Sequence, residues 1–237
     1  METFSVFPAA GLKFLSALAK NNKREWFQPR KAEFDEFVHA PMVALAALLN
    51  RELERIAPAY AFPDPAKALN RIYRDVRFSA DKTPYQNHVS AVFPQQRLGK
   101  KQGSAFYISV TPKEAMLAGG IYFGDTRQLQ AVREHLAEHH AQFQKLISSK
   151  PRAAVFGELQ GEKLQRVPRQ FGIDHPAAEL LRHKQWMLWK KWPGEALTKP
   201  AFAKEAVKAI NLLAPFVEFL NEPLLALPVL SEPLSVE

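Results

Sequence analysis

The chain has 237 residues, and its 32 Lys and Arg against 24 Asp and Glu give a net charge of +8. Its proportions of hydrophobic residues (47%) and charged residues (24%) are those of a globular protein, which excludes disorder, collagen and a coiled coil as descriptions of the whole chain. The chain contains no cysteine, and this absence excludes disulfides, thiolate nucleophiles and cysteine-ligated zinc.

The first 57 residues have the periodicity of helices. Leu12, Leu15 and Leu18 recur at helical spacing, and Pro29 and Pro41 mark places where a helix can begin, since a first turn tolerates proline. We therefore expect three helical stretches, over residues 11–20, 23–39 (restarting at Pro29) and 41–56.

The next part of the chain has the pattern of β-strands. Residues 106–111 alternate, with Phe106, Ile108 and Val110 on one face, and the connections are too short for crossover helices. Gly119-Gly120 indicates a bulge or a close backbone approach. We expect an antiparallel meander built from runs over residues 71–79, 89–93, 105–111 and 115–123.

The remaining chain is predicted to return to helices. We expect helices over residues 126–148 (capped by Asp125 or Thr126), 176–190 and 200–221, with irregular chain or short strands over 150–175. Pro215 should kink the last helix, and an extended tail should begin at Glu222. The pattern predicts one α+β domain over residues 1–237, with an antiparallel sheet (about residues 71–123) packed against N- and C-terminal helices.

Positive charge is concentrated in two segments. Residues 71–113 hold eight Lys and Arg against two acids, and residues 145–199 hold eleven against five, so each segment carries +6 while the rest of the chain sums to −4. These segments could form one positive surface for an anionic partner, although such charge can also serve only solubility.

The densest polar segment spans residues 71–85. As a strand it would place Arg71, Asp75 and Arg77 on one face, so the single carboxylate could neutralise only one of the two arginines. Arg74 would lie on the other face and should reach Asp81 after the turn. Because guanidinium groups match carboxylate and phosphate oxygens, we predict an anion site. Its residues would be Arg71, Arg74, Arg77 and Lys82.

This segment, R-I-Y-R-D-V-R-F-S-A-D-K-T-P-Y, resembles the signature of an uncharacterised family of hypothetical proteins, domain of unknown function 2461. Four further stretches are similar to the family's motifs, so the resemblance covers nearly the whole chain. They are N-N-K-R-E-W-F (21–27), G-G-I-Y (119–122, followed by Leu129 and Arg133), G-E-K-L-Q-R-V-P (161–168) and D-H-P (174–176, followed by Leu180, Leu181 and Lys184).

The resemblance implies a shared fold and supplies no established activity, substrate or cofactor. Two departures bear on whether the stretch after Gly161 binds an anion. Gln165 occupies a position that is usually basic in the family, and Gln170 one that is usually glycine.

Three other patterns carry less weight. His135, Glu138 and His139 form an H-x-x-E-H pattern, which can bind zinc, and Glu205 and Glu218 lie downstream. Both histidines flank the apolar stripe of the helix, however. We therefore interpret the pattern as a solvated helix face and expect no metal. The glycines before residue 125 match no phosphate-loop pattern, and we expect no cofactor. The spacing of Trp186 and Trp189 favours core helix positions over base stacking.

Three functions remain open. The first is an anion- or phosphate-binding protein, with an enzyme on a small anionic substrate as its extension; its proton-transfer candidates are Asp75, Asp81, Tyr85 and His88. The second is a nucleic-acid-binding protein that uses the basic segments and exposed tryptophans. The third is a non-catalytic module in which the Arg/Asp motif is a structural lattice of ion pairs.

The sequence also carries an expectation about location. No run of about 18 apolar residues occurs, and Met1-Glu2 lacks the basic start of a signal peptide. We expect a cytoplasmic protein with no membrane partner.

Overall fold

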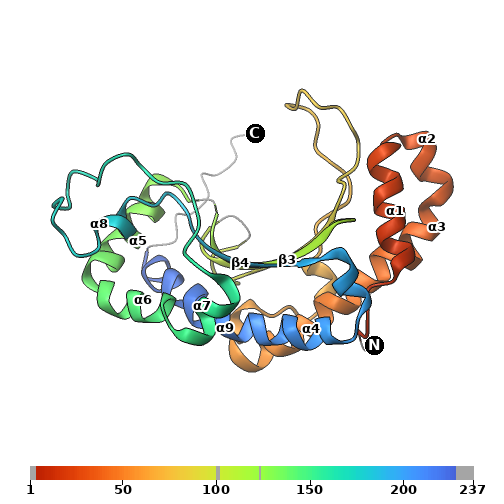
Figure 1. Cartoon of the computed structure of the whole chain (residues 1–237). Helices are drawn as coiled ribbons and strands as arrows, with labels where there is room; N and C mark the ends of the chain where they lie inside the picture. Colours follow the sequence, from red (N-terminus) through yellow and green to blue (C-terminus); the bar gives the residue numbers. More distant parts are fainter. Residues whose placement is uncertain (1–3, 100–101, 123, 228–237) are drawn as a thin grey trace.

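The structure is a computed structural model, and it describes residues 4–99, 102–122 and 124–227 (Figure 1). The N-terminal part is helical: α1 (Ala9–Lys20), α2 (Arg24–Phe27), η1 (Gln28–Arg30), α3 (Lys31–Phe34), η2 (Asp35–His39), α4 (Ala40–Ile56), η3 (Pro58–Tyr60) and η4 (Pro65–Ala68). Three strands follow: β1 (Val89–Pro94), β2 (Ala105–Val110) and β3 (Glu114–Ile121). The last part contains α5 (Thr126–Glu138), α6 (His140–Ile147), α7 (Lys150–Phe156), α8 (Ala178–Leu181), β4 (Trp186–Pro193), η5 (Gly194–Thr198) and α9 (Ala201–Leu225).

The strands form one antiparallel sheet in the order β1-β2-β3-β4. The predicted α+β class is confirmed, as is the packing of the sheet against helices from both ends of the chain. The predicted sheet range of about residues 71–123 is wrong at both limits, because the strands begin at Val89 and the fourth lies at 186–193. Phe123, the predicted end of the third run, lies outside the described residues.

Helices α4 and α9 lie along one face of the sheet (Figure 1). The strand residues on that face are large, apolar and fully buried, as Phe106, Ile108 and Leu117 show. Hydrophobic burial at this interface therefore supplies much of the stability of the fold.

Gly119 and Gly120 allow close packing on both sides of β3. A Cβ on Gly119 would lie 2.8 Å from the Val217 side chain of α9, and one on Gly120 would lie 2.0 Å from the carbonyl oxygen of Trp186 in β4. Gly120 also has a φ of +133°, which side chains disfavour. The predicted close backbone approach is confirmed.

The fourth strand overturns a predicted helix. Of residues 176–190 only α8 is helical, and Trp186–Pro193 pair with β3 over its whole length. The run W-M-L-W-K-K-W has apolar residues at intervals of both two and three, so periodicity alone does not separate strand from helix. The backbone hydrogen bonds offered by β3 decide the outcome.

The other helices follow the predictions with three exceptions. The restart near Pro29, the start of α4 near Pro41 and the cap at Asp125 are confirmed, and Asp125 accepts a hydrogen bond from the Gln128 N–H. However, α7 lies in a stretch predicted to be irregular, the predicted 126–148 helix breaks at His139, and α9 passes through Pro215 to Leu225, so 222–225 are helical. The rest of the predicted tail, from residue 228, lies outside the described residues.

Within the described ranges, no helix has both the length and the apolar character needed to cross a membrane.

Candidate functional site

The polar segment over residues 71–85 is a loop that stands on the edge of β1. Leu69 pairs with Ala91, and the Asn70 N–H donates to the Ser90 carbonyl at 2.8 Å. Tyr73 then pairs with Tyr85, so the two arms of the loop run side by side.

The strand predicted over residues 71–79 is therefore wrong. Asp75 and Asp81 accept hydrogen bonds from the N–H groups of Arg77 and Thr83, each two residues further on. Such side-chain-to-backbone bonds compete with strand pairing and favour turns.

Two of the motif's three arginines are paired within the loop. Arg74 forms an ion pair with Asp81 and a hydrogen bond with the Thr83 hydroxyl, so the predicted partnership across the turn is confirmed. Arg77 binds Asp75 through two nitrogens, Nε to Oδ1 at 3.0 Å and Nη2 to Oδ2 at 2.8 Å. Arg74 and Arg77 therefore each hold a carboxylate of the same loop, which is the structural role that the ion-pair hypothesis predicts for this motif.

The pairing also changes the acidity of the two carboxyl groups. The Thr83 N–H and the Arg74 guanidinium lower the pKa of Asp81 to about 2. The hydrogen bond from Arg77 lowers the pKa of Asp75. Both carboxylates are thus held in the charged form, which suits an ion-pair partner better than a proton donor.

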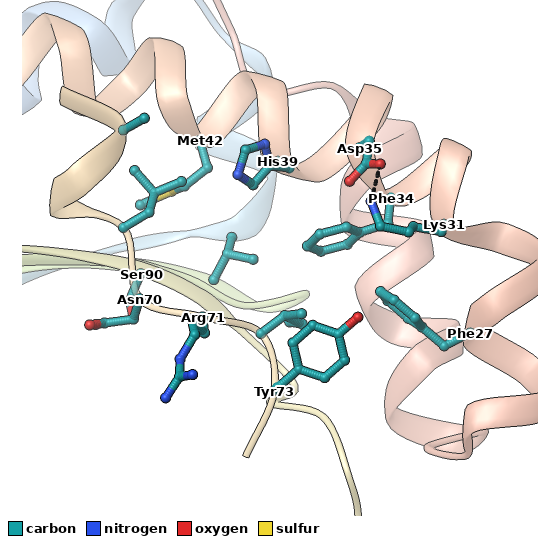
Figure 2. Close-up of a pocket in the computed structure, with 14 residues that line it drawn as sticks. Phe27, Lys31, Phe34, Asp35, His39, Met42, Asn70, Arg71, Tyr73 and Ser90 are labelled. Atoms are coloured by element: carbon teal, nitrogen blue, oxygen red, sulfur yellow. Dashed lines mark hydrogen bonds and ion pairs between the residues drawn. The ribbon is translucent and has the colours of Figure 1, made fainter. Parts of the chain in front are cut away.

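Arg71 differs from the other two arginines. It is exposed, and it makes no ion pair with any residue that the structure describes. It lines a pocket of about 400 Å³ between the loop and the helical run from α2 to α4. Figure 2 shows its guanidinium on the far side of the loop backbone from the helix that carries His39 and Met42, so it stands at the rim of the pocket.

The pocket has apolar walls and polar groups at its margins. Phe34, Met42, Ile72 and Val89 are buried and form much of the wall. The polar residues in the lining are Lys31, Asp35, His39, Asn70, Arg71, Tyr73 and Ser90.

The polar groups at the margins differ in how they are bonded. Lys31 and Asp35 form an ion pair with each other (Figure 2), and the Asn70 amide donates to the Ser90 hydroxyl at 2.9 Å. Arg71 forms no ion pair with a described residue, and its charge adds to the Arg77 hydrogen bonds that lower the pKa of Asp75.

A helical irregularity shapes the wall opposite Arg71. The run from α3 to α4 contains a π-turn over Asp35–His39, in which the Ala40 N–H bonds to the Asp35 carbonyl. Pro41 has no N–H for the Phe37 carbonyl, and a Cβ on Gly11 of α1 would lie 2.1 Å from that oxygen, so only glycine fits there. Single π-turns are common at functional sites.

Lys82 lies at a second, more open depression. Its Nζ donates to the Val76 carbonyl at 2.9 Å. The depression has a volume of about 540 Å³ and is lined by residues 22–25, 76 and 81–84. Arg71 and Lys82 therefore line separate depressions.

The other predicted proton-transfer residues do not gather at the pocket. Tyr85 is buried, stacks on Phe27 with ring centroids 4.2 Å apart, and has its pKa raised by burial. His88 is half-buried, burial lowers its pKa, and it lines neither depression.

Sequence reasoning missed the residues on the helical wall. Lys31, Asp35 and His39 follow one another at intervals of four, and Pro41 comes soon after. That polar stripe is a signal, but a solvated helix face gives the same one.

The histidine pair on α5 lies away from this pocket. The ring centroids of His135 and His139 are 4.6 Å apart, and His135 Nε2 lies 3.3 Å from a Glu222 oxygen of α9. Glu205, one of the two glutamates downstream of this pattern, accepts a hydrogen bond from the Trp192 indole. Across the described part of the chain, no group of three or more His, Asp or Glu is arranged to hold a metal ion.

The fold and site define an α+β protein with a polar-rimmed pocket beside its first strand. Residues 10–219 match the family described as "Conserved hypothetical protein (DUF2461)", and the chain belongs to this family. A search of curated proteins gives no match.

Proposed function

We propose that this protein binds a small organic anion in the pocket beside Arg71. The observation that carries the proposal is the position of Arg71, which has no ion-pair partner among the described residues and stands at the rim of a pocket of about 400 Å³. Ligand pockets commonly measure about 300–1,000 Å³ and combine apolar walls with a few polar groups.

The ligand would have an anionic head and an apolar body. The Arg71 guanidinium suits a carboxylate or phosphate, and Asn70 beside it can donate a further hydrogen bond. The buried side chains of Phe34, Met42 and Val89 would contact the apolar body. His39 and Tyr73 line the same pocket, so a proton-transfer step on a small anionic substrate would use these groups.

The sequence alone gives Arg71 and Arg77 equal weight, and their different bonding separates them. Arg77 holds Asp75 through two hydrogen bonds, whereas Arg71 has no such partner in the described chain. Arg71 is therefore the primary anion-binding residue in this proposal, and Arg77 is its matched control.

The test is thermal unfolding with phosphate, phenyl phosphate or chloride at equal ionic strength, which separates binding from screening. A ligand at 100 times its Kd stabilises a protein by about 2.7 kcal/mol. We expect phosphate to stabilise wild type and Arg77→Gln but not Arg71→Gln, and phenyl phosphate to do so at lower concentration. Equal stabilisation of all three proteins would overturn the proposal.

A further inference from the structure

The sheet has a second face that carries no described helix (Figure 1). Its large apolar and aromatic side chains are Val92, Tyr107, Met116, Met187 and Trp189, and all five are half-buried. On the opposite face the corresponding large residues are almost fully buried. We call this second face the open face.

Two aromatic residues stand in one row of the open face. Tyr107 is opposite Ala118 in the register of β2 and β3, and Ala118 is opposite Trp189 in the register of β3 and β4. Directly paired residues share a face, and neighbouring strands are about 4.8 Å apart, so the Cα atoms of Tyr107 and Trp189 lie about 10 Å apart with Ala118 between them.

A loop flanks each edge of the open face. The 71–85 loop joins the sheet where Leu69 pairs with Ala91 of β1, and the segment after α7 joins it where Gln160 pairs with Met187 of β4. Both loops rise on the side of the open face (Figure 1).

Both loops carry exposed arginines that form no ion pair with a described residue. Arg71 lies in the first loop, and Arg166 and Arg169 lie in the second. None of the three makes an ion pair within the part of the chain that the structure describes. The loops that carry these arginines therefore join the sheet at its two opposite edges, β1 and β4.

The net charge is also unevenly distributed along the sequence. Residues 71–113 and 145–199 carry +6 each, while the rest sums to −4. These two segments contain both flanking loops and the strands β1, β2 and β4. The positive excess therefore lies in the parts of the sequence that form these strands and loops.

We infer that single-stranded nucleic acid binds across the open face. Bases stack on Tyr107 and Trp189, and phosphates meet the arginines of the two loops. Every base has a π-face, so aromatic side chains between cations bind single strands with little dependence on sequence. The stacking residues do not depend on the small-anion pocket, since Tyr107 and Trp189 do not line it, but the two proposed sites share Arg71.

The position of Trp189 revises the residues that the sequence offers for stacking. Trp186 is fully buried and Trp192 is 5% exposed, because both lie on the helix-covered face. Trp189 alternates to the open face. Trp192 lies on the same strand as Trp189 but on the opposite face, so it provides a matched control for Trp189.

The test is fluorescence anisotropy with labelled single-stranded oligo-dT and oligo-U at low salt. One stacked base is worth about 1–3 kcal/mol, so we expect Trp189→Leu and Tyr107→Leu each to weaken binding by about tenfold. Trp189→Phe keeps a ring and should bind within about threefold of wild type. Trp192→Phe should bind like wild type.

Three results would overturn the inference. They are no binding of either oligomer by wild type, unchanged binding by both leucine variants, and binding of duplex DNA as tight as that of single strands. Circular dichroism and thermal unfolding check that each variant folds, and the two leucine variants test the same claim on different strands. Heparin provides a control for charge alone, and its binding should not depend on Trp189.

Discussion

The two faces of the sheet are built from the same strands but differ in burial. On one face, Phe106, Ile108 and Leu117 are fully buried under α4 and α9. On the other, Tyr107 and Trp189 remain half-buried between two loops. Alternate residues of a strand therefore differ here: those on the covered face stabilise the fold, and those on the open face form the surface that we propose for recognition.

The largest expected loss of stability comes from replacing Leu117 in β3, and its neighbour Met116 provides the comparison. Leu117 is fully buried on the covered face, so Leu117→Ala should lower the free energy of unfolding by about 3 kcal/mol through lost transfer energy and a cavity. Met116 is half-buried on the open face, and Met116→Ala should cost about 1 kcal/mol or less. Urea denaturation measures both, and equal costs would contradict the assignment of the faces.

Alkaline pH should destabilise the covered side. Tyr60 packs against Phe106 with ring centroids 5.2 Å apart, its hydroxyl accepts a hydrogen bond from Asn221, and burial raises its pKa to about 12. The raised pKa stabilises the fold below pH 10, and this stability should be lost as pH rises toward 12.

The expected loss from Tyr60 is about 2 kcal/mol at pH 12. Unfolding at pH 9–12 measures it, and Tyr60→Phe should show a smaller alkaline loss than wild type. The same alkaline loss in both proteins would show that Tyr60 does not cause it.

A smaller loss of stability is expected at acid pH, from the Asp81 carboxylate in the 71–85 loop. The pKa of Asp81 is lowered to about 2 by the Thr83 N–H and by Arg74, so its stabilising effect should be present above about pH 4 and lost as pH falls toward 2. In Asp81→Asn this part of the acid dependence should disappear. Because Asp81 is exposed, a change as large as that of Leu117→Ala would contradict this account.

Local chemistry made much of the fold predictable. The alternation over residues 106–111, the prolines at helix starts and the glycine pair in β3 each act through neighbouring residues, and each prediction was confirmed. The Arg74–Asp81 ion pair was predictable for the same reason, since it closes a short turn.

The errors arise where distant segments decide the structure. Residues 186–193 become a strand because β3 offers them a partner about 70 residues away in sequence, and tertiary contacts override local propensity. The pocket beside Arg71 joins residues 31–42 to residues 69–73, and no local pattern connects these segments. The π-turn that shapes its wall depends on the contact of Gly11 with the Phe37 carbonyl.

Methionine methyl NMR can separate the two proposed sites in one sample. The chain has four methionines: Met42 lines the pocket beside Arg71, Met116 and Met187 lie on the open face, and Met1 lies outside the described residues. Each proposed site therefore has its own methyl reporter.

The most direct measurement of the account is a titration of ¹³C-methyl-methionine protein, first with phenyl phosphate and then with single-stranded oligo-dT. We predict that phenyl phosphate shifts the Met42 signal and leaves Met116 and Met187 unchanged, while oligo-dT shifts Met116 and Met187 and leaves Met42 unchanged. Oligo-dT that shifts only Met42, or neither open-face methionine, would contradict the claim that the uncovered face of the sheet is the recognition surface.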